Sequence, residues 1–348
     1  MLLTPGPTAL PPSVRDVMSE ELINPDVDPA FADRYDALLD KLGTVFGTDD
    51  EVVVMGGEGI LGLEAAIAST VEPGDRVLCL SNGPYGDGFT DFVESYGAES
   101  TLVDADYDDS LPVVELERTL AAGEYDVATM VHCETPTGTL NDLSPALDLL
   151  DEHGVLTIVD AVSSLGGAPV PTDRIDICLG ASQKCFSAPP GLAIASVSDV
   201  AWDRIEARDP ASLYTNLLPW HEAEQPYPYT HLTTLVVALD EALDLLLDEG
   251  LDAVHDRHRE VAAYCRERGA EMGLDPYPDP ERSSPTVTAF SVPGRATALQ
   301  ERLREAHDVT LATGFGDLAD DVLRVGHMGY NADPDRVERA MDALAAER

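Results

Sequence analysis

From residue 51 to residue 181 the sequence alternates apolar segments with amphipathic ones. The apolar segments are nearly continuous runs, as in "VLTIVDA" (155–161), and the amphipathic ones have helical spacing, as in "LSPALDLLDEHG" (143–154). Strands that are apolar throughout are buried on both faces, so the parallel sheet they form must have helices on each side. The pattern predicts an α/β fold with a mainly parallel sheet, whose ligands bind beyond the carboxyl ends of the strands.

The pattern also predicts how the chain is divided. A proline-rich N-terminal arm is expected at 1–15, a large domain at 16–249 and a smaller C-terminal α/β domain at 250–348. In the large domain, strands are predicted at 51–55, 75–80, 99–105, 127–133, 155–161 and 176–181, and helices at 31–47, 61–71, 88–97, 112–123, 143–154 and 233–250. In the smaller domain, strands are predicted at 286–292 and 321–329, and helices at 251–273, 296–308 and 334–347.

The charge of the chain excludes some partners. The formal net charge is −44, from 65 acidic and 21 basic side chains, which argues against a nucleic-acid backbone or an anionic membrane as a partner. Such an acidic surface is typical of proteins from salt-loving organisms. The five cysteines form no CxxC pair, and no signal peptide or long apolar run is evident, so a reduced, unexported cytoplasmic protein is expected.

Lysine is almost absent, which makes one lysine informative. Lys41 and Lys184 are the only two, and Lys184 lies among small residues in "GASQKCFSAPPGLA". A Schiff base requires an amine that can lose its proton, which arginine cannot do. Asp160 ends the apolar strand 155–161, and Lys184 follows one short strand later. An aspartate paired with a ring nitrogen accompanies the Schiff-base lysine of pyridoxal phosphate enzymes. Asp160 could instead cap a helix or pair with a buried arginine, and Lys184 could be a surface residue like Lys41.

A glycine-rich turn offers an anion site. The segment 51–69 reads as strand, turn and helix, and the amides that begin such a helix can bind a phosphate. Gly57, Gly59 and Gly62 also fit the G-x-G-x-x-G pattern of dinucleotide-binding proteins. The next strand ends without the acid that would hold a ribose, so a single phosphate is preferred. Glu58 complicates both readings, because its carboxylate would repel an anion in that turn.

Two further residues could contact a ligand, Tyr85 through an aromatic ring and Arg324 through a carboxylate of the ligand. Tyr85 follows a strand end and could stack on a pyridine ring, or it could be an ordinary loop aromatic. Arg324 lies among apolar neighbours in "DDVLRVGHMG" and needs a carboxylate, either that of a substrate or that of one of the many acids in the chain.

Taken together, these motifs resemble the class V, fold type I, pyridoxal-phosphate-dependent aminotransferases, near the alanine–glyoxylate and serine–pyruvate branch. The resemblance runs from "LLTPGPT" to "LRVGHMG", with "VDAVSSLGG" and "SQKCFSAPPG" as its most specific motifs. It implies transamination between alanine or serine and glyoxylate or pyruvate, with ping-pong kinetics, through a Schiff base on Lys184.

The resemblance also implies a role for each site residue. Asp160 would pair with the ring nitrogen and Arg324 would bind the substrate carboxylate, in a pocket lined by "TPGPT" with Gly6 at its centre. The other implied contacts of the cofactor are Val162 and Tyr85 on the ring, Thr135 near the ring hydroxyl, Gly59, Ile60 and Gln183 on the phosphate, and Tyr227 and Thr230 on the phosphate of a neighbouring subunit. The contacts implied for Tyr227 and Thr230 also imply a homodimer or a dimer of dimers with shared active sites.

Within this family, "GEGILGLEAAIAS", "PYGDGF" and "ETPTGTLN" are most similar to pyridoxamine–pyruvate aminotransferases, which take the free vitamer as a substrate. There a glutamate at position 58 would be suitable, because no phosphate has to be bound. Tyr227, Thr230 and Gln183 retain groups that can bind a phosphate, so bound pyridoxal phosphate is the preferred expectation. The free-vitamer reaction is the alternative.

Other classes of function fit the residues less well. A desulfurase would need a mobile loop cysteine, whereas Cys265 lies within a helical pattern. A metal site could be built from His255, His258 and Asp256, but their surroundings read as a solvated helix face. A non-enzymatic binding protein would have no need of Lys184 and Asp160 together.

The net charge predicts how stability depends on salt. Raising KCl from about 0.1 M to about 1 M shortens the Debye length from about 10 Å to about 3 Å, which screens repulsion among the acidic side chains. We therefore expect the melting temperature, followed by circular dichroism, to rise with KCl. A neutral osmolyte at the same osmolality is the control and should stabilise less. A melting temperature that does not rise with KCl would contradict this.

Overall fold

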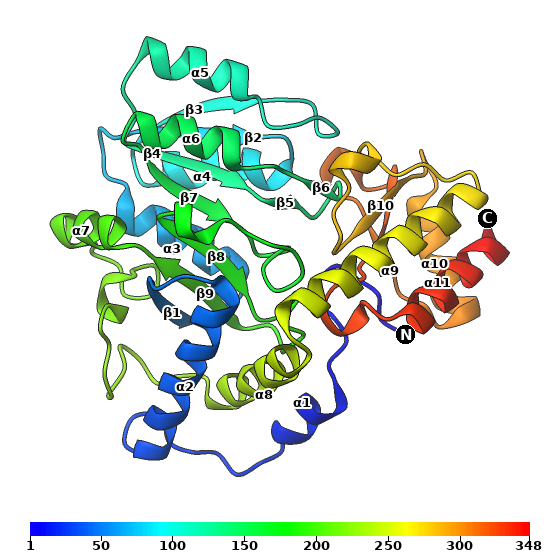
Figure 1. Ribbon diagram of the computed structural model, residues 1–348, viewed down its shortest axis with the longest axis horizontal. Helices are drawn as coiled ribbons and strands as arrows, with labels where there is room; N and C mark the ends of the chain where they lie inside the picture. Colours follow the sequence, from blue (N-terminus) through cyan, green and yellow to red (C-terminus); the bar gives the residue numbers. More distant parts are fainter.

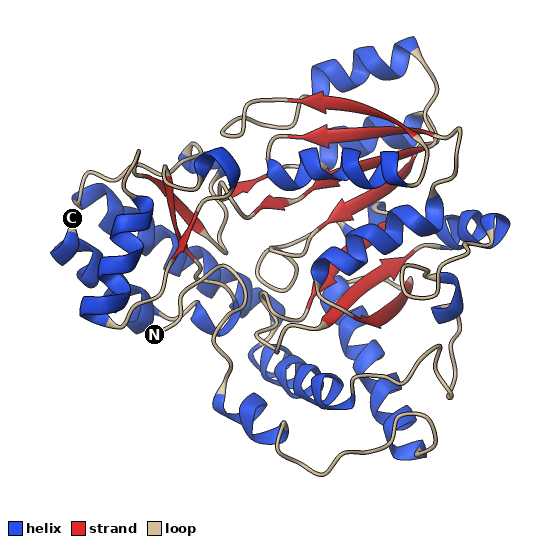
Figure 2. Cartoon of the chain, turned by 180° about the vertical axis from the view of Figure 1, so that it is seen from behind, coloured by secondary structure: helices blue, strands red, loops and turns tan.

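The structure is a computed structural model that describes residues 1–348. Its centre is a seven-stranded sheet in the order β1-β9-β8-β7-β4-β2-β3. Figures 1 and 2 show the sheet from opposite sides, with helices against both faces and a smaller group of elements beside it. The mixed, mostly parallel sheet between helices confirms the predicted α/β fold.

The bounds of the elements follow the chain. The helices are α1 (Pro12–Val17), α2 (Pro29–Phe46), α3 (Gly59–Thr70), α4 (Pro84–Ser95), α5 (Val113–Ala122), α6 (Ser144–Glu152), α7 (Asp199–Arg208), α8 (Thr233–Glu249), α9 (Leu251–Glu271), α10 (Ala296–His307) and α11 (Pro334–Glu347). The strands are β1 (Glu51–Gly56), β2 (Arg76–Ser81), β3 (Glu99–Asp104), β4 (Val127–Val131), β5 (Cys133–Glu134), β6 (Thr139–Leu140), β7 (Leu156–Asp160), β8 (Ile177–Ala181), β9 (Leu192–Val197), β10 (Thr288–Ser291), β11 (Ala312–Thr313) and β12 (Val322–Val325).

Every predicted strand and helix is present, with ends shifted by a few residues. Burial of whole strands such as β4, β7 and β8 explains why the apolar runs were readable. The sequence analysis did not predict helices α1 and α7 or the short strands β6 and β11. These elements are at most ten residues long, and the shortest have too few residues to show a period.

Strand β9 was also missed, and its direction matters for the site. It pairs antiparallel with β8 on one side and with β1 on the other, and all of its residues are buried. Antiparallel neighbours need no crossover helix, so β9 lies outside the strand–helix alternation from which the others were predicted. The connection between β8 and β9 is instead a loop, residues 182–191, and this loop carries Lys184.

A second, smaller sheet packs with the C-terminal helices. Its order is β10-β12-β11, and its apolar residues form a core of 19 buried residues, separate from the large core of 67. Helix α9 reaches both cores, because Val254 belongs to the large one and Val261 to the small one. The domain boundary at residue 250 stays a prediction. Leu3, from the predicted N-terminal arm, is fully buried in the small core.

The carboxyl ends of the central strands face the smaller sheet. Strands β4, β7 and β8 are parallel, so the residues that follow them lie at one edge of the sheet. In Figure 1 the small C-terminal sheet and the N-terminus lie beside the large sheet. No helix combines the length and the apolar character needed to cross a membrane.

Candidate active site

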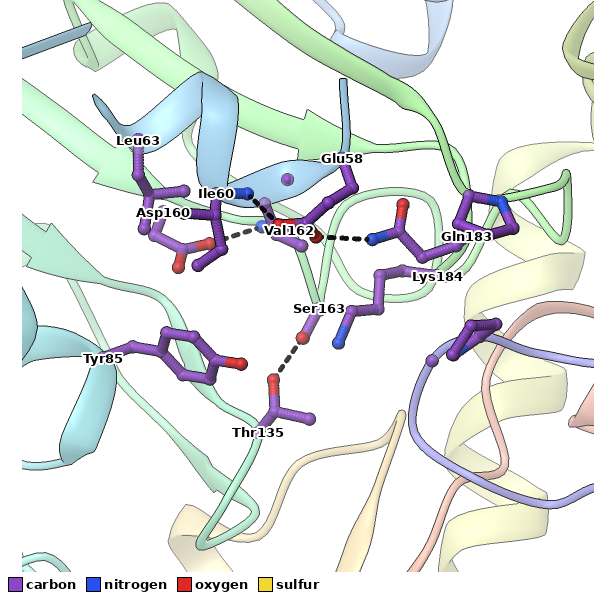
Figure 3. A pocket seen from close by; sticks show the side chains of 14 residues that line it. Glu58, Ile60, Leu63, Tyr85, Thr135, Asp160, Val162, Ser163, Gln183 and Lys184 are labelled. Carbon is purple, nitrogen blue, oxygen red and sulfur yellow. Dashed lines mark hydrogen bonds between the residues drawn. The ribbon is translucent and has the colours of Figure 1, made fainter. Parts of the chain in front are cut away.

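A cavity of about 230 Å³ opens at this edge of the sheet. Most of the residues singled out by the sequence line it, and they come from six separate stretches of the chain. Its fourteen lining residues are Gly6, Pro7, Glu58, Gly59, Ile60, Leu63, Tyr85, Thr135, Asp160, Val162, Ser163, Gln183, Lys184 and Pro190. In Figure 3 the Asp160 carboxylate and the Lys184 side chain lie on two sides of this cavity, and the Tyr85 side chain extends into the same space.

Asp160 holds a buried carboxylate at the last position of β7. It is 6% exposed, and its Oδ1 accepts a hydrogen bond of 2.8 Å from the Val162 amide. Burial raises the pKa of Asp160 to about 6, although the Val162 amide and Lys184 oppose this. One oxygen therefore caps the following turn, as the capping alternative supposed, while no arginine pairs with the carboxylate. Its Oδ2 has no partner in the chain and remains for a ligand.

Lys184 differs from Lys41, the only other lysine, in the partners of its amine and in its pKa. Its Nζ donates a hydrogen bond of 2.9 Å to the Pro5 carbonyl and forms no ion pair. Burial lowers the pKa of Lys184, while Asp160 raises it. Lys41, by contrast, pairs with Asp240 and Asp244, each at 2.6 Å. Lys184 is thus a partly buried amine that gives up its proton more readily than an ordinary lysine, as a nucleophile or base must.

Glu58 occupies the anion site that the sequence assigned to a phosphate. It is the N-cap of α3, and its Oε1 accepts from the Ile60 amide at 3.2 Å. Its Oε2 accepts from Gln183 Nε2, also at 3.2 Å (Figure 3). Two donors expected to bind a phosphate are therefore engaged by a carboxylate of the chain itself. Gly59 packs closely beneath, where a Cβ would lie 3.3 Å from Val162 Cγ1.

Arg324 has the surroundings of a carboxylate-binding residue. It is 5% exposed, and its Nε and Nη1 donate to the carbonyls of Thr313 at 2.7 Å and Thr135 at 3.3 Å. Its guanidinium lies over the Phe315 ring at 4.7 Å, and the Phe315 ring meets that of Tyr85 edge-on at 6.2 Å. Burial lowers the pKa of Arg324 to about 10. No acid of the chain pairs with it, so one edge, with Nη2, remains free for a ligand.

Glu134, which no sequence pattern indicated, fixes the position of Tyr85. Glu134 is fully buried, and its two oxygens accept from the amides of Tyr85 at 3.2 Å and Gly86 at 2.7 Å. Helix α4 has no side-chain cap of its own, so Glu134 serves as a cap from β5. Burial raises the pKa of Glu134 to about 8. Its place in "HCETPTG", beside the predicted Thr135, was the only signal in the sequence.

The remaining predicted residues divide into two groups. Thr135 and Val162 line the cavity, and the Thr135 hydroxyl is hydrogen-bonded to that of Ser163, which the sequence analysis did not single out. Tyr227 and Thr230 lie outside it: Tyr227 packs on Tyr35 with ring centroids 4.8 Å apart, and the Thr230 hydroxyl donates to Asp26 at 2.9 Å. Their contact with a neighbouring subunit stays a prediction.

The residues considered for a metal site and for a desulfurase serve the fold instead. His258 is fully buried, and its ring nitrogens contact the Val254 carbonyl at 2.7 Å and the Gly329 amide at 2.9 Å, so neither nitrogen is left for a metal. The predicted solvated face holds for Asp252, Asp256 and Arg259, which are exposed, but it is wrong for His258 itself. Cys265 is buried in the small core.

The cavity fits a pyridine ring better than it fits a phosphate. Asp160 offers a free oxygen for a protonated ring nitrogen, Lys184 offers an amine of lowered pKa for a carbonyl carbon, and Tyr85 and Val162 offer flat or apolar surfaces. The phosphate donors, in contrast, are already bound to Glu58.

Comparison with known proteins decides the family. The sequence profile of the class V aminotransferases matches residues 1–317. The chain belongs to this family. It is 34% identical to the pyridoxamine–pyruvate transaminase of Mesorhizobium japonicum, over 98% of this chain and 90% of that protein. It is also 34% identical to the alanine–glyoxylate aminotransferase of Oryctolagus cuniculus, over 99% of this chain and 91% of that protein.

Solved structures of aminotransferases are similar to this chain over nearly its whole length. The pyridoxamine–pyruvate aminotransferase of Mesorhizobium loti superposes with a TM-score of 0.96 at 33% identity, over 100% of this chain and 91% of that one. The alanine–glyoxylate aminotransferase of a Nostoc species gives a TM-score of 0.95 at 32% identity, over 99% of this chain and 94% of that one. The chain is therefore an aminotransferase with the fold type I architecture, and the dinucleotide alternative is excluded.

Burial of the Asp160 carboxylate predicts that the free energy of unfolding of the aminotransferase falls as the pH rises. The pKa of Asp160 is raised from 3.8 to about 6, so the folded state binds the proton more tightly than the unfolded one. The stability that the protonated Asp160 contributes at low pH is therefore lost as pH rises from about 4 to 6, and the loss is on the order of 3 kcal/mol. We expect ligand-free Asp160→Asn to be more stable than the wild type above pH 6 and equally stable near pH 4.

Denaturant unfolding at several pH values in high KCl measures this difference. Asp108→Asn, which removes an exposed carboxylate, is the control for the loss of one negative charge. Equal stability of Asp160→Asn and Asp108→Asn at pH 7 would contradict the expectation.

Proposed function

We propose that this aminotransferase transfers an amino group between a small amino acid, such as alanine or serine, and a small 2-oxo acid, such as glyoxylate or pyruvate. The observation that carries the proposal is that the buried Asp160 and the partly buried Lys184 line one cavity, with Arg324 close by. The named relatives act on substrates of this size, and the family implies pyridoxal phosphate chemistry.

Each residue has a task that its surroundings support. When bound, a pyridoxal ring supplies a sink for the electrons left when the α-carbon of the amino acid loses its proton. Asp160 Oδ2 holds a proton at the ring nitrogen, which keeps the ring electron-poor. Lys184 Nζ accepts the proton from the α-carbon and returns one, because its lowered pKa leaves a lone pair available. The free edge of Arg324 binds the substrate carboxylate.

A second proposal concerns the form of vitamin B6, and Glu58 favours it. The Glu58 carboxylate takes the Ile60 amide and Gln183 Nε2, and its charge repels a phosphate. We infer that the enzyme uses pyridoxal and pyridoxamine without a phosphate, as exchangeable substrates that pair with pyruvate and alanine. Bound pyridoxal phosphate, which the sequence favoured, would require Glu58 to give up its hydrogen bonds with the Ile60 amide and Gln183 Nε2.

Substitutions at Lys184 and Arg324 test the transfer reaction. Lys184→Ala and Lys184→Arg should both abolish turnover of alanine with glyoxylate and of pyridoxamine with pyruvate, since guanidinium cannot lose its proton. Arg324→Leu should raise KM for the 2-oxo acid by about 100-fold, because the substrate carboxylate loses its charged partner.

Arg336→Leu is the matched control, since Arg336 also lies over an aromatic ring, at 4.4 Å from that of Tyr330, but outside the cavity. Turnover by Lys184→Arg, or an unchanged KM in Arg324→Leu, would refute the assigned roles.

Removing the Glu58 carboxylate tests the choice of vitamer. Wild-type protein, dialysed free of vitamers, should bind pyridoxal more tightly than pyridoxal phosphate in absorbance titrations. Glu58→Ala frees two donors, so it should bind pyridoxal phosphate about 10-fold to 100-fold more tightly than the wild type and bind pyridoxal unchanged. Glu64→Ala, which removes another acid of α3, is the control for charge alone. Tight binding of pyridoxal phosphate by the wild type would refute the proposal.

A further inference from the structure

The N-terminal residues join the small sheet. The Leu3 amide donates to the Thr310 carbonyl at 2.9 Å, and the Leu3 carbonyl accepts from the Gly326 amide, just after β12, at 2.7 Å. The Leu3 side chain is fully buried in the small core. The start of the chain is therefore fixed to the C-terminal elements.

A few residues later, the same segment is bonded to the loop that carries Lys184. The Thr8 amide donates to the Gln183 carbonyl at 3.1 Å, and the Thr8 hydroxyl donates to that of Ser187, also at 3.1 Å. Ser187 in turn accepts from the Tyr330 amide at 2.8 Å. The segment 3–8 is thus anchored at both ends, on the small sheet and on the lysine loop.

Between these anchors the backbone meets the Lys184 side chain directly. The Pro5 carbonyl is the acceptor for Lys184 Nζ at 2.9 Å. At Gly6 a Cβ would lie 2.5 Å from Lys184 Cδ and 2.9 Å from Nζ, closer than side chains pack. Gly6 also has φ +89°, a conformation that strains any residue with a Cβ. Only glycine leaves room for the lysine at this point.

We propose that Pro5 and Gly6 are the positioning residues for the Lys184 amine, and that they couple its position to the small sheet. A lysine side chain has four flexible bonds, and Lys184 has no acid bonded to its amine that would fix them. The Pro5 carbonyl and the bare Cα of Gly6 hold Nζ at the cavity wall, which lowers the entropy cost of reaching a carbonyl carbon. Because Leu3 is part of the small core, any shift of the small sheet moves the amine. The inference rests on the proposed function in that Nζ is the reacting amine.

The reaction of free pyridoxal with Lys184 tests this without measuring transamination. With no amino acid or 2-oxo acid present, the adduct is reduced with borohydride at set times and quantified on its peptide by mass spectrometry. Lys41, the only other lysine, reports in the same sample the reactivity of an amine that is ion-paired with two acids and lies outside the cavity. Assays in high KCl keep the acidic protein folded.

Gly6→Ala and Gly250→Ala form a matched pair. Gly250 has φ +87°, so alanine strains both backbones alike, but a Cβ at Gly250 meets nothing within 4 Å. Gly6→Ala should slow formation of the Lys184 adduct by about 100-fold, because a displacement of about 1 Å has that effect on a positioned group. Gly250→Ala should react like the wild type. Equal rates in the two variants would overturn the positioning role.

A second pair separates positioning from folding and tests the coupling. Leu3→Ser loosens the arm from the small core, whereas Leu274→Ser weakens the same core elsewhere. Leu3→Ser should slow the Lys184 adduct relative to Leu274→Ser, and equal rates would overturn the coupling. If Gly6→Ala does not show the cooperative melting transition of the wild type, the comparison of Leu3→Ser with Leu274→Ser tests the proposal in its place.

The result with wild-type protein separates the two proposals. A wild type that forms no adduct on Lys184 refutes the proposed function, and the inference with it. A wild-type adduct with equal rates in Gly6→Ala and Gly250→Ala refutes the inference alone.

Discussion

A buried carboxylate and a partly buried amine around one cavity are the constraint on which the rest of the structure depends. Asp160 is almost fully buried with one oxygen unpartnered, and Lys184 is bonded to a backbone carbonyl rather than to an acid. Each group costs free energy in this state, because burial disfavours its charged form. A strand end and a loop that pack on a large core hold them there. The protein thus keeps unsatisfied groups that a ring nitrogen and a carbonyl carbon can satisfy.

The local electrostatics of the cavity oppose the overall charge of the chain. An acidic protein repels anions at long range, so a carboxylate substrate must be held by a nearby donor, and Arg324 is the buried cation without an acidic partner. At the other end, Glu58 caps α3 and fills the anion site there. A single side chain therefore caps a helix and takes two donors that an anionic ligand would otherwise use.

Much of the fold and of the candidate site could be predicted from the sequence, and each feature that was not predicted has a physical reason. Buried parallel strands are apolar throughout, so their runs were visible, whereas β9 is antiparallel and has no crossover helix to mark it. Asp160 and Lys184 stood out because their chemistry is unusual in their setting. Glu134 acts on Tyr85 from 49 residues away along the chain, and no local pattern reports such a contact. The solvated reading of His258 failed because the charged residues around it on α9 do not show which neighbours pack on its face.

The sequence by itself determined the α/β architecture, the family and the candidates for the reactive groups, because these depend on periodicity, on motifs and on which side chains can do the chemistry. Only the tertiary structure decided what each group is bonded to. It turned Glu58 onto the Ile60 amide and Gln183, placed Phe315 between Tyr85 and Arg324, and brought the Pro5 carbonyl to the lysine amine. These contacts join segments far apart in the chain, and they form only once the cores have fixed the distances between strands, loops and the N-terminal segment.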